Sequence, residues 1–429
     1  MRIIGFTGIM LVFSLLLQAE ENGITVRDFK QQVLTYSRQI KQRTEERHAM
    51  LEAIRVAKTA FFPAFDFSGN YQYRLHSYAF DFGTGQSAEL DRNSYSLGAS
   101  VSQPLYAGGG IYHQYKALQI QGEITLAEES LATDNVLYAA DLNYWSAAAQ
   151  KGLHEVMQQY VCIIKNLEQV LATRFEEGQI SKTDLLQVRT RLKEAELEES
   201  ATAKAYEMAR QNMNVLMGFP PSTSLILHDP ITRELPLPAL VGIEQAWENR
   251  QEYRISLLEV AYQKRKIKLS KAPYNPTLSV GFQVNWGTPS LNVKGAGQIW
   301  SPALVATLQI PLFRWGARMK EIHSQKALLY SRGYALEMTR DQITLEVSQA
   351  WTSLKEDTKQ IHIAEEACRI AEENLALNTF SYTEGKLPIV DVLSAQLAWI
   401  QSFSSLIQAW HQQKVSLARY YKAVGLRQF

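Results

Sequence analysis

The sequence predicts a mainly α-helical chain that also contributes four strands to a transmembrane β-barrel. Three observations lead there. Two long stretches lack proline, between Pro104 and Pro220 and between Pro311 and Pro388. Four short segments alternate apolar and polar residues with a period of two. Finally, the chain repeats itself at a fixed offset, so one unit of strands and long helices occurs twice.

The N-terminal segment has the layout of a signal peptide. Met1 and Arg2 are followed by an apolar stretch that ends at Leu17, and Ala19 supplies a small residue for cleavage. The stretch is shorter than the ~20 residues that a membrane-spanning helix needs, and no later window reaches that length. The chain carries 44 basic and 43 acidic residues, so it has no net positive charge strong enough to indicate nucleic-acid binding. We expect an exported protein whose leader is residues 1–19.

The internal repeat organises the rest of the chain. Four pairs of residues share an offset of 207: Pro104 and Pro311, Gly178 and Gly385, Asp184 and Asp391, and Gly218 and Gly425. The predicted division is a first copy at 20–218, a linker or equatorial region at 219–240 and a second copy at 241–429. Each copy should contain a helix, two strands and a long helical hairpin.

The strands are expected in two pairs, one pair in each copy. They span 65–74 and 95–102 in the first copy, and 278–286 and 304–310 in the second. One face of each is apolar or aromatic and the other is polar, at about the length of a transmembrane strand. Because open strand edges are not tolerated in lipid, several chains must share one barrel. Three copies would supply twelve strands.

The helical stretches are unusually long. Residues 110–177 would extend ~100 Å as one helix. Gly178 and Gly385 interrupt the two stretches where a left-handed glycine would cap a helix, and Ser181 and Asp184 would begin the next one. Each copy should therefore form a helical hairpin with a tight tip.

Four segments resemble the TolC-type outer membrane efflux family. They are 60–63 (Ala-Phe-Phe-Pro), 273–276 (Pro-Tyr-Asn-Pro), 103–109 (Gln-Pro-Leu-Tyr-Ala-Gly-Gly) and 248–253 (Glu-Asn-Arg-Gln-Glu-Tyr). The resemblance covers nearly the whole mature chain. It implies a homotrimer with a twelve-stranded barrel in the outer-membrane lipid and a tunnel of helices across the periplasm. The tunnel would meet a periplasmic adaptor protein and, through it, an inner-membrane pump, with no cofactor.

The resemblance also implies a gate where the helical hairpins end. The gate would comprise Tyr382, Asp184, Thr183 and Asp391, and the adaptor-contact tips would comprise Gly178, Gly385 and Leu387. Tyr382 and Asp184 could hydrogen-bond across the two hairpins. Leu387 stands where the family pattern has an arginine, and Ser394 where it has a second acid, so one gate contact and one acidic ring are missing. The alternative is that Tyr382 packs like its counterpart Phe175 while both aspartates serve only their own helix ends.

No enzyme constellation is present in the sequence. The eight histidines are scattered without ligand spacing, and Gly108-Gly109-Gly110 lacks the Lys-Ser or Lys-Thr of a phosphate loop. We therefore expect an exit duct of an efflux or type I secretion system. A periplasmic helical-hairpin adaptor or structural tether is the alternative, although it leaves the four strands unexplained. The residues leave drug, metal-ion and polypeptide cargo open.

Overall fold

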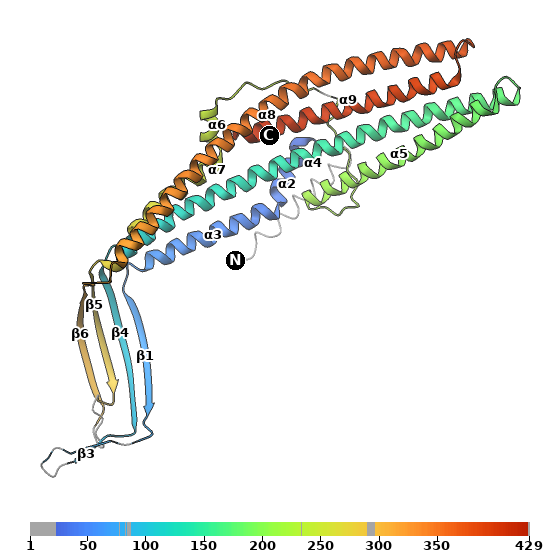
Figure 1. Cartoon of the computed structure of the whole chain (residues 1–429). Coiled ribbons are helices and arrows are strands. Elements are labelled where there is room, and N and C mark those ends of the chain that lie inside the picture. Colours follow the sequence, from blue (N-terminus) through green and yellow to red (C-terminus); the bar gives the residue numbers. More distant parts are fainter. Residues whose placement is uncertain are drawn as a thin grey trace. The chain divides into compact units, whose positions relative to one another are not determined.

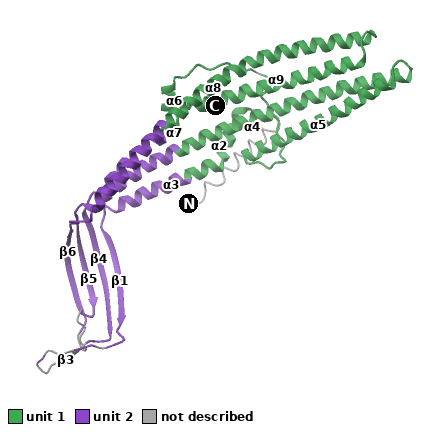
Figure 2. Cartoon of the chain, in the orientation of Figure 1, with its two compact units in different colours: residues 1–44, 128–253, 338–429 green, residues 45–127, 254–337 purple. Residues whose placement is uncertain are grey.

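The computed structural model describes residues 23–427 apart from 77, 82, 84–86, 233 and 290–296 (Figure 1). The predicted leader at 1–19 lies outside the described residues. The chain divides into two compact units, which Figure 2 distinguishes by colour. Unit 1 comprises 1–44, 128–253 and 338–429, and unit 2 comprises 45–127 and 254–337. Each unit takes part of both predicted copies.

Unit 2 contains an antiparallel sheet of four strands in the order β1-β4-β5-β6. Their bounds are β1 Ala64–Tyr73, β4 Asn93–Ala107, β5 Thr277–Gly287 and β6 Ile299–Gln309. Two short strands, β2 Ala79–Asp81 and β3 Ser87–Glu89, pair in the connection between β1 and β4. The four strands that the sequence predicts are therefore confirmed, and β4 pairs with β5 across the two copies.

The strand register sorts apolar and polar side chains onto opposite faces. One row across the sheet contains Phe65, Val101, Phe282 and Leu304, and the adjacent row contains Asp66, Ser100, Gln283 and Ala303. Neighbouring residues in a strand point to opposite faces, so these rows define an apolar face and a polar one. Phe65 and Leu304 are 78% and 85% exposed in the single chain.

The helices account for most of the chain. Their bounds are α2 Val26–Tyr36, α3 Arg38–Thr59, α4 Gly110–Glu176, α5 Lys182–Met217, α6 Ile243–Asn249, α7 Gln251–Leu269, η1 Ala272–Tyr274, α8 Ala317–Thr383 and α9 Ile389–Val424. Helices α4 and α8 have 67 residues each, which corresponds to ~100 Å. Helices α5 and α9 have 36 residues each. Within the described residues, none of the helices has the length and apolar character to span a membrane.

Three apolar clusters hold the helices of unit 1 together. The first includes Phe29, Tyr144 and Met213 from α2, α4 and α5. The second lies near the ends of both hairpins, and the third includes Leu354 and Tyr420 from α8 and α9. These side chains are nearly inaccessible to solvent, and their burial is the main source of helix packing. The two cysteines, Cys162 and Cys368, are free thiols.

Candidate functional site: the hairpin tips

The first hairpin turns at Gly178. This residue has φ of 75°, and its N–H donates to the carbonyl oxygen of Phe175 at 3.0 Å. The N–H of Gln179 donates to the carbonyl oxygen of Arg174 at 2.8 Å. This pair of bonds is the Schellman arrangement, in which a left-handed residue satisfies the last carbonyls of a helix. Glycine adopts that conformation without a Cβ penalty.

Helix α5 begins at once with a capping box between Ser181 and Asp184. The Ser181 hydroxyl oxygen accepts a hydrogen bond from the Asp184 N–H at 3.1 Å. In return, the Asp184 carboxylate accepts from the Ser181 N–H at 3.3 Å and from its hydroxyl at 2.9 Å. The Asp184 carboxylate therefore serves the start of its own helix. Thr183 lies in the same turn and is exposed.

The second hairpin turns in the same way at Gly385. Its φ is 71°, and its N–H donates to the carbonyl oxygen of Tyr382 at 3.0 Å. The N–H of Lys386 donates to the carbonyl oxygen of Ser381 at 2.9 Å. Leu387 follows and is half-buried, while Gly385 is exposed. Both tips thus present a glycine turn at the surface of unit 1.

Asp391 differs from its counterpart Asp184. The N-cap of α9 is Pro388, which has no side chain able to form a capping box, and the Asp391 N–H donates to the Pro388 carbonyl oxygen at 3.2 Å. Across the described residues, no hydrogen bond or ion pair occupies the Asp391 carboxylate. Asp391 is half-buried in the first turn of α9, where the helix dipole favours a negative charge.

An apolar cluster beneath the tips joins the two hairpins. Leu171, Leu185 and Val188 come from the first hairpin, and Ile389 and Val392 come from the second. All five side chains are almost completely buried. The same cluster supports residues of the predicted gate, because the gate residues lie in the turns next to these positions.

Tyr382 packs against this cluster and lies next to Arg174. The Arg174 Cζ is 5.9 Å from the centroid of the tyrosine ring, within the range of a cation–π contact. Burial raises the pKa of the Tyr382 phenol, and the charge of Asp184 adds to the rise, whereas Arg174 lowers it. Among the described residues there is no hydrogen bond between Tyr382 and Asp184. The structure therefore brings the two predicted gate residues near each other, with Arg174 as the direct contact of the tyrosine.

Arg174 is the tip residue that the sequence analysis missed. The family pattern places an arginine at position 387, where this chain has leucine. Arg174 lies on the other hairpin, and its counterpart in the second copy is Ser381, so neither motif nor repeat identified it. Only the packing of the hairpins places this guanidinium at Tyr382.

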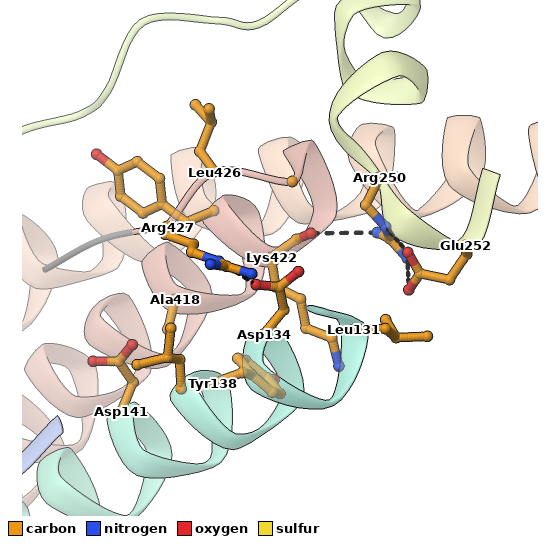
Figure 3. Close-up of a pocket in the computed structure, with 13 residues that line it drawn as sticks. Leu131, Asp134, Tyr138, Asp141, Arg250, Glu252, Ala418, Lys422, Leu426 and Arg427 are labelled. Atoms are coloured by element: carbon orange, nitrogen blue, oxygen red, sulfur yellow. Dashed lines mark hydrogen bonds and ion pairs between the residues drawn. The ribbon is translucent and has the colours of Figure 1, made fainter. Parts of the chain in front are cut away.

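A second charged cluster lies at the C-terminal end of α9 and is shown in Figure 3. The Arg250 side chain is 8% exposed and donates through Nε and Nη2 to both carboxylate oxygens of Glu252, each at 2.8 Å. Its Nη1 donates to Glu346 at 2.9 Å and to the carbonyl oxygen of Ala423 at 3.1 Å. This arginine therefore connects α7, α8 and α9. The Arg250 and Glu252 of the 248–253 segment thus have a structural role, as partners in this ion pair. In the described part of the chain, no group of His, Cys, Asp and Glu side chains could hold a metal ion.

Comparisons with known proteins agree on one family. The family model for outer membrane efflux proteins matches residues 30–219 and 242–426. None of the curated proteins gives a significant match.

The solved structures with the same fold include several bacterial channels. CusC superimposes with a TM-score of 0.79 at 14% identity, over 94% of this chain and 92% of the other. The Campylobacter jejuni outer membrane channel CmeC gives 0.78 at 15% identity, over 93% and 85%. The open state of the Neisseria gonorrhoeae outer membrane channel MtrE gives 0.77 at 15% identity, over 94% and 89%. By family model and by fold, the chain belongs to the outer membrane efflux proteins, the channels of the outer membrane whose helical part lies in the periplasm.

Proposed function

We propose that three copies of this chain form the exit duct of a multicomponent efflux or type I secretion system, which passes solutes outward without catalysing a reaction. The observation that carries the proposal is the four-stranded sheet. Strands β1 and β6 are its edges: among the described residues each pairs on one side only, β1 with β4 and β6 with β5. Unpaired backbone groups are too costly in lipid, so the edges require strands from other copies. Three copies close a barrel of twelve strands.

The two faces of the sheet suit such a barrel. The apolar row, which includes Phe65 and Leu304, would contact lipid. The polar row, which includes Asp66 and Gln283, would face a water-filled lumen. The alternation of side chains along each strand makes this division unavoidable once the barrel closes.

The hairpin tips are the proposed contact with a periplasmic adaptor and, through it, with an inner-membrane pump. Gly178 and Gly385 are exposed, and Leu387 follows the second turn. Helix ends expose backbone groups that a partner can satisfy. At the same tips, Tyr382, Thr183 and Asp184 would belong to the gate. Three Asp391 carboxylates around the axis would favour cations over anions.

The proposal is tested by Gly178→Pro. Proline fixes φ near −65° and removes the N–H, whereas Gly178 has φ of 75° and donates to Phe175. The tip should therefore be remodelled and export should be lost. Trimers should still form, and the loop at 76–93 should still be labelled on the cell surface.

Gly242→Pro is the matched control, because Gly242 already has φ of −64° and a Cβ there would meet nothing within 4 Å. We expect this variant to retain export. Normal export by Gly178→Pro, or adaptor cross-links found only at the strands, would contradict the tip assignment.

A further inference from the structure

All four connections between strands and helices lie at one end of the sheet in unit 2. Strands β1 and β5 start there, and strands β4 and β6 end there, because each neighbouring pair is antiparallel. We call the segments at this end the junction belt, which comprises residues 53–62, 108–118, 262–276 and 310–322. These segments include the adjoining ends of α3, α4, α7 and α8.

The junction belt is strongly basic. It carries eleven Lys and Arg residues and one acid, Glu321. The connections at the opposite end of the sheet, residues 74–92 and 288–298, carry three basic and three acidic residues. The excess of positive charge is therefore confined to the end of the sheet from which the helices leave.

Helix α7 provides the largest share of this charge. Lys264 and Lys268 are one helical turn apart and both are exposed. The positive potential reaches the neighbouring helix α4, where burial lowers the pKa of His113 and the charges of Lys268 and Arg265 lower it further. Two basic side chains of α7, Lys268 and Arg265, are therefore close enough to α4 to affect His113 electrostatically.

Aromatic side chains connect the segments of the belt. Phe61, after α3, stacks edge-on against Tyr115 of α4 with the ring centroids 5.9 Å apart. The Arg314 Cζ, after β6, lies 5.5 Å from the centroid of the Tyr274 ring, which precedes β5. One aromatic contact thus joins the segments at 53–62 and 108–118, and one cation–π contact joins those at 262–276 and 310–322.

Trp315 is held in an unfavourable backbone conformation within this surface. It has φ of 47° and is 90% exposed, as is Leu312, and its ring lies 5.0 Å from that of Phe313. Its counterpart in the first copy is Gly108, where a Cβ would come within 2.4 Å of the Ala272 carbonyl oxygen. A non-glycine residue in this region is strained, and such strain is typical of functional positions. Tryptophan with an apolar ring and an N–H suits a membrane–water interface.

We propose that the junction belt binds anionic phospholipid headgroups of the periplasmic leaflet of the outer membrane. The exposed apolar residues Leu304 and Leu308 of β6 are followed along the chain by the exposed Leu312 and Trp315 of the belt. The basic groups of the belt would therefore meet the membrane at headgroup level. Ammonium and guanidinium groups form charge-assisted hydrogen bonds with phosphate. Their stems can pack along apolar surface while the charged ends reach the headgroups. The inference uses the membrane location of the family and is independent of cargo and adaptor.

The test measures lipid binding to the intact trimer of the full chain in neutral detergent. Phosphatidylglycerol and phosphatidylcholine with the same acyl chains are compared by counting the lipids retained in native mass spectrometry. Lys264→Gln, Lys268→Gln and Arg314→Gln are combined in one variant. Each basic residue near an anionic surface changes affinity roughly fivefold, so the preference for phosphatidylglycerol should fall at least tenfold. The preference should also weaken in high salt.

The matched control removes three exposed lysines from unit 1, in the combined variant K165Q/K204Q/K359Q. We expect it to keep the wild-type preference. Equal retention of both lipids by the wild-type trimer would overturn the proposal, and so would an equal loss in the control. Unchanged lipid preference in the belt variant, together with altered ion selectivity in planar bilayers, would assign these charges to the channel lumen instead. Failure of the chain to form membrane-inserted trimers would be a failure of the proposed function, which this assay separates from loss of lipid preference.

Discussion

If the hairpin tips form the proposed gate, replacing Arg174 with alanine should shift the channel towards its open state. Arg174 belongs to the first hairpin and contacts the ring of Tyr382 in the second, with 5.9 Å between Cζ and the ring centroid. Any opening that separates the two hairpins must break this contact. Leu387 stands where the family pattern has an arginine. The guanidinium that contacts Tyr382 therefore comes from Arg174.

The magnitude follows from the half-buried setting of the contact. A cation–π pair contributes about 0.5–1 kcal/mol when exposed and about 2 kcal/mol when desolvated, so about 1 kcal/mol is a reasonable value here. Three equivalent contacts in a trimer would favour closure by about 3 kcal/mol if they open together. Since each 1.4 kcal/mol is a factor of ten, Arg174→Ala should raise the ratio of open to closed channels roughly a hundredfold.

Single-channel recording of trimers in planar bilayers measures this ratio. The double variant Tyr382→Phe with Asp184→Ala tests the alternative gate contact, a phenol-to-carboxylate hydrogen bond. Because the phenylalanine ring keeps the cation–π contact with Arg174 and loses only the interaction of Arg174 with the phenol oxygen, the double variant should open less often than Arg174→Ala. Arg189→Ala is the control, since Arg189 is in the same hairpin and is paired with Glu168 at the surface. Unchanged opening of Arg174→Ala trimers, or an equal effect of Arg189→Ala, would refute the reasoning.

Three further predictions concern the strands, a buried arginine and a half-buried histidine. Val280→Arg on the apolar face should cost ~2–4 kcal/mol and reduce heat-resistant trimers on gels, whereas Gln283→Arg on the polar face should not, and equal losses would contradict the barrel. Arg250→Ala removes a buried guanidinium whose partner carboxylates, Glu252 and Glu346, are 30% and 37% exposed, so it should cost about 1.5–3 kcal/mol and lower the thermal midpoint; an unchanged midpoint would make the network dispensable. Burial lowers the pKa of His411 from its ordinary value of 6.5, so the unfolded chain binds the proton more readily and stability should fall as the pH drops below that value. His411→Gln should reduce this pH-dependent loss of stability, measured by thermal unfolding between about pH 7.5 and pH 5. The same substitution at the exposed His362 should leave the loss unchanged.

Local patterns in the sequence were sufficient to predict most of the secondary structure. The strand expected at 278–286 is Thr277–Gly287, and the helix expected at 110–177 is Gly110–Glu176. Period-two alternation and the positions of glycine and proline depend on neighbouring residues, so they need no tertiary information. The short strands β2 and β3 were not predicted, because three residues are too few to show a period.

The sequence by itself determined the class of fold, the family and the two glycine turns, because each depends on residues that are close along the chain or repeat at a fixed offset. The tertiary structure decided which side chains meet across the hairpins. Asp184 is engaged by Ser181, whereas Tyr382 meets Arg174, a residue that no motif identified. Contacts of this kind depend on the rotation of packed helices about their axes. That rotation is fixed by the apolar cluster beneath the tips, which forms only when both hairpins are assembled.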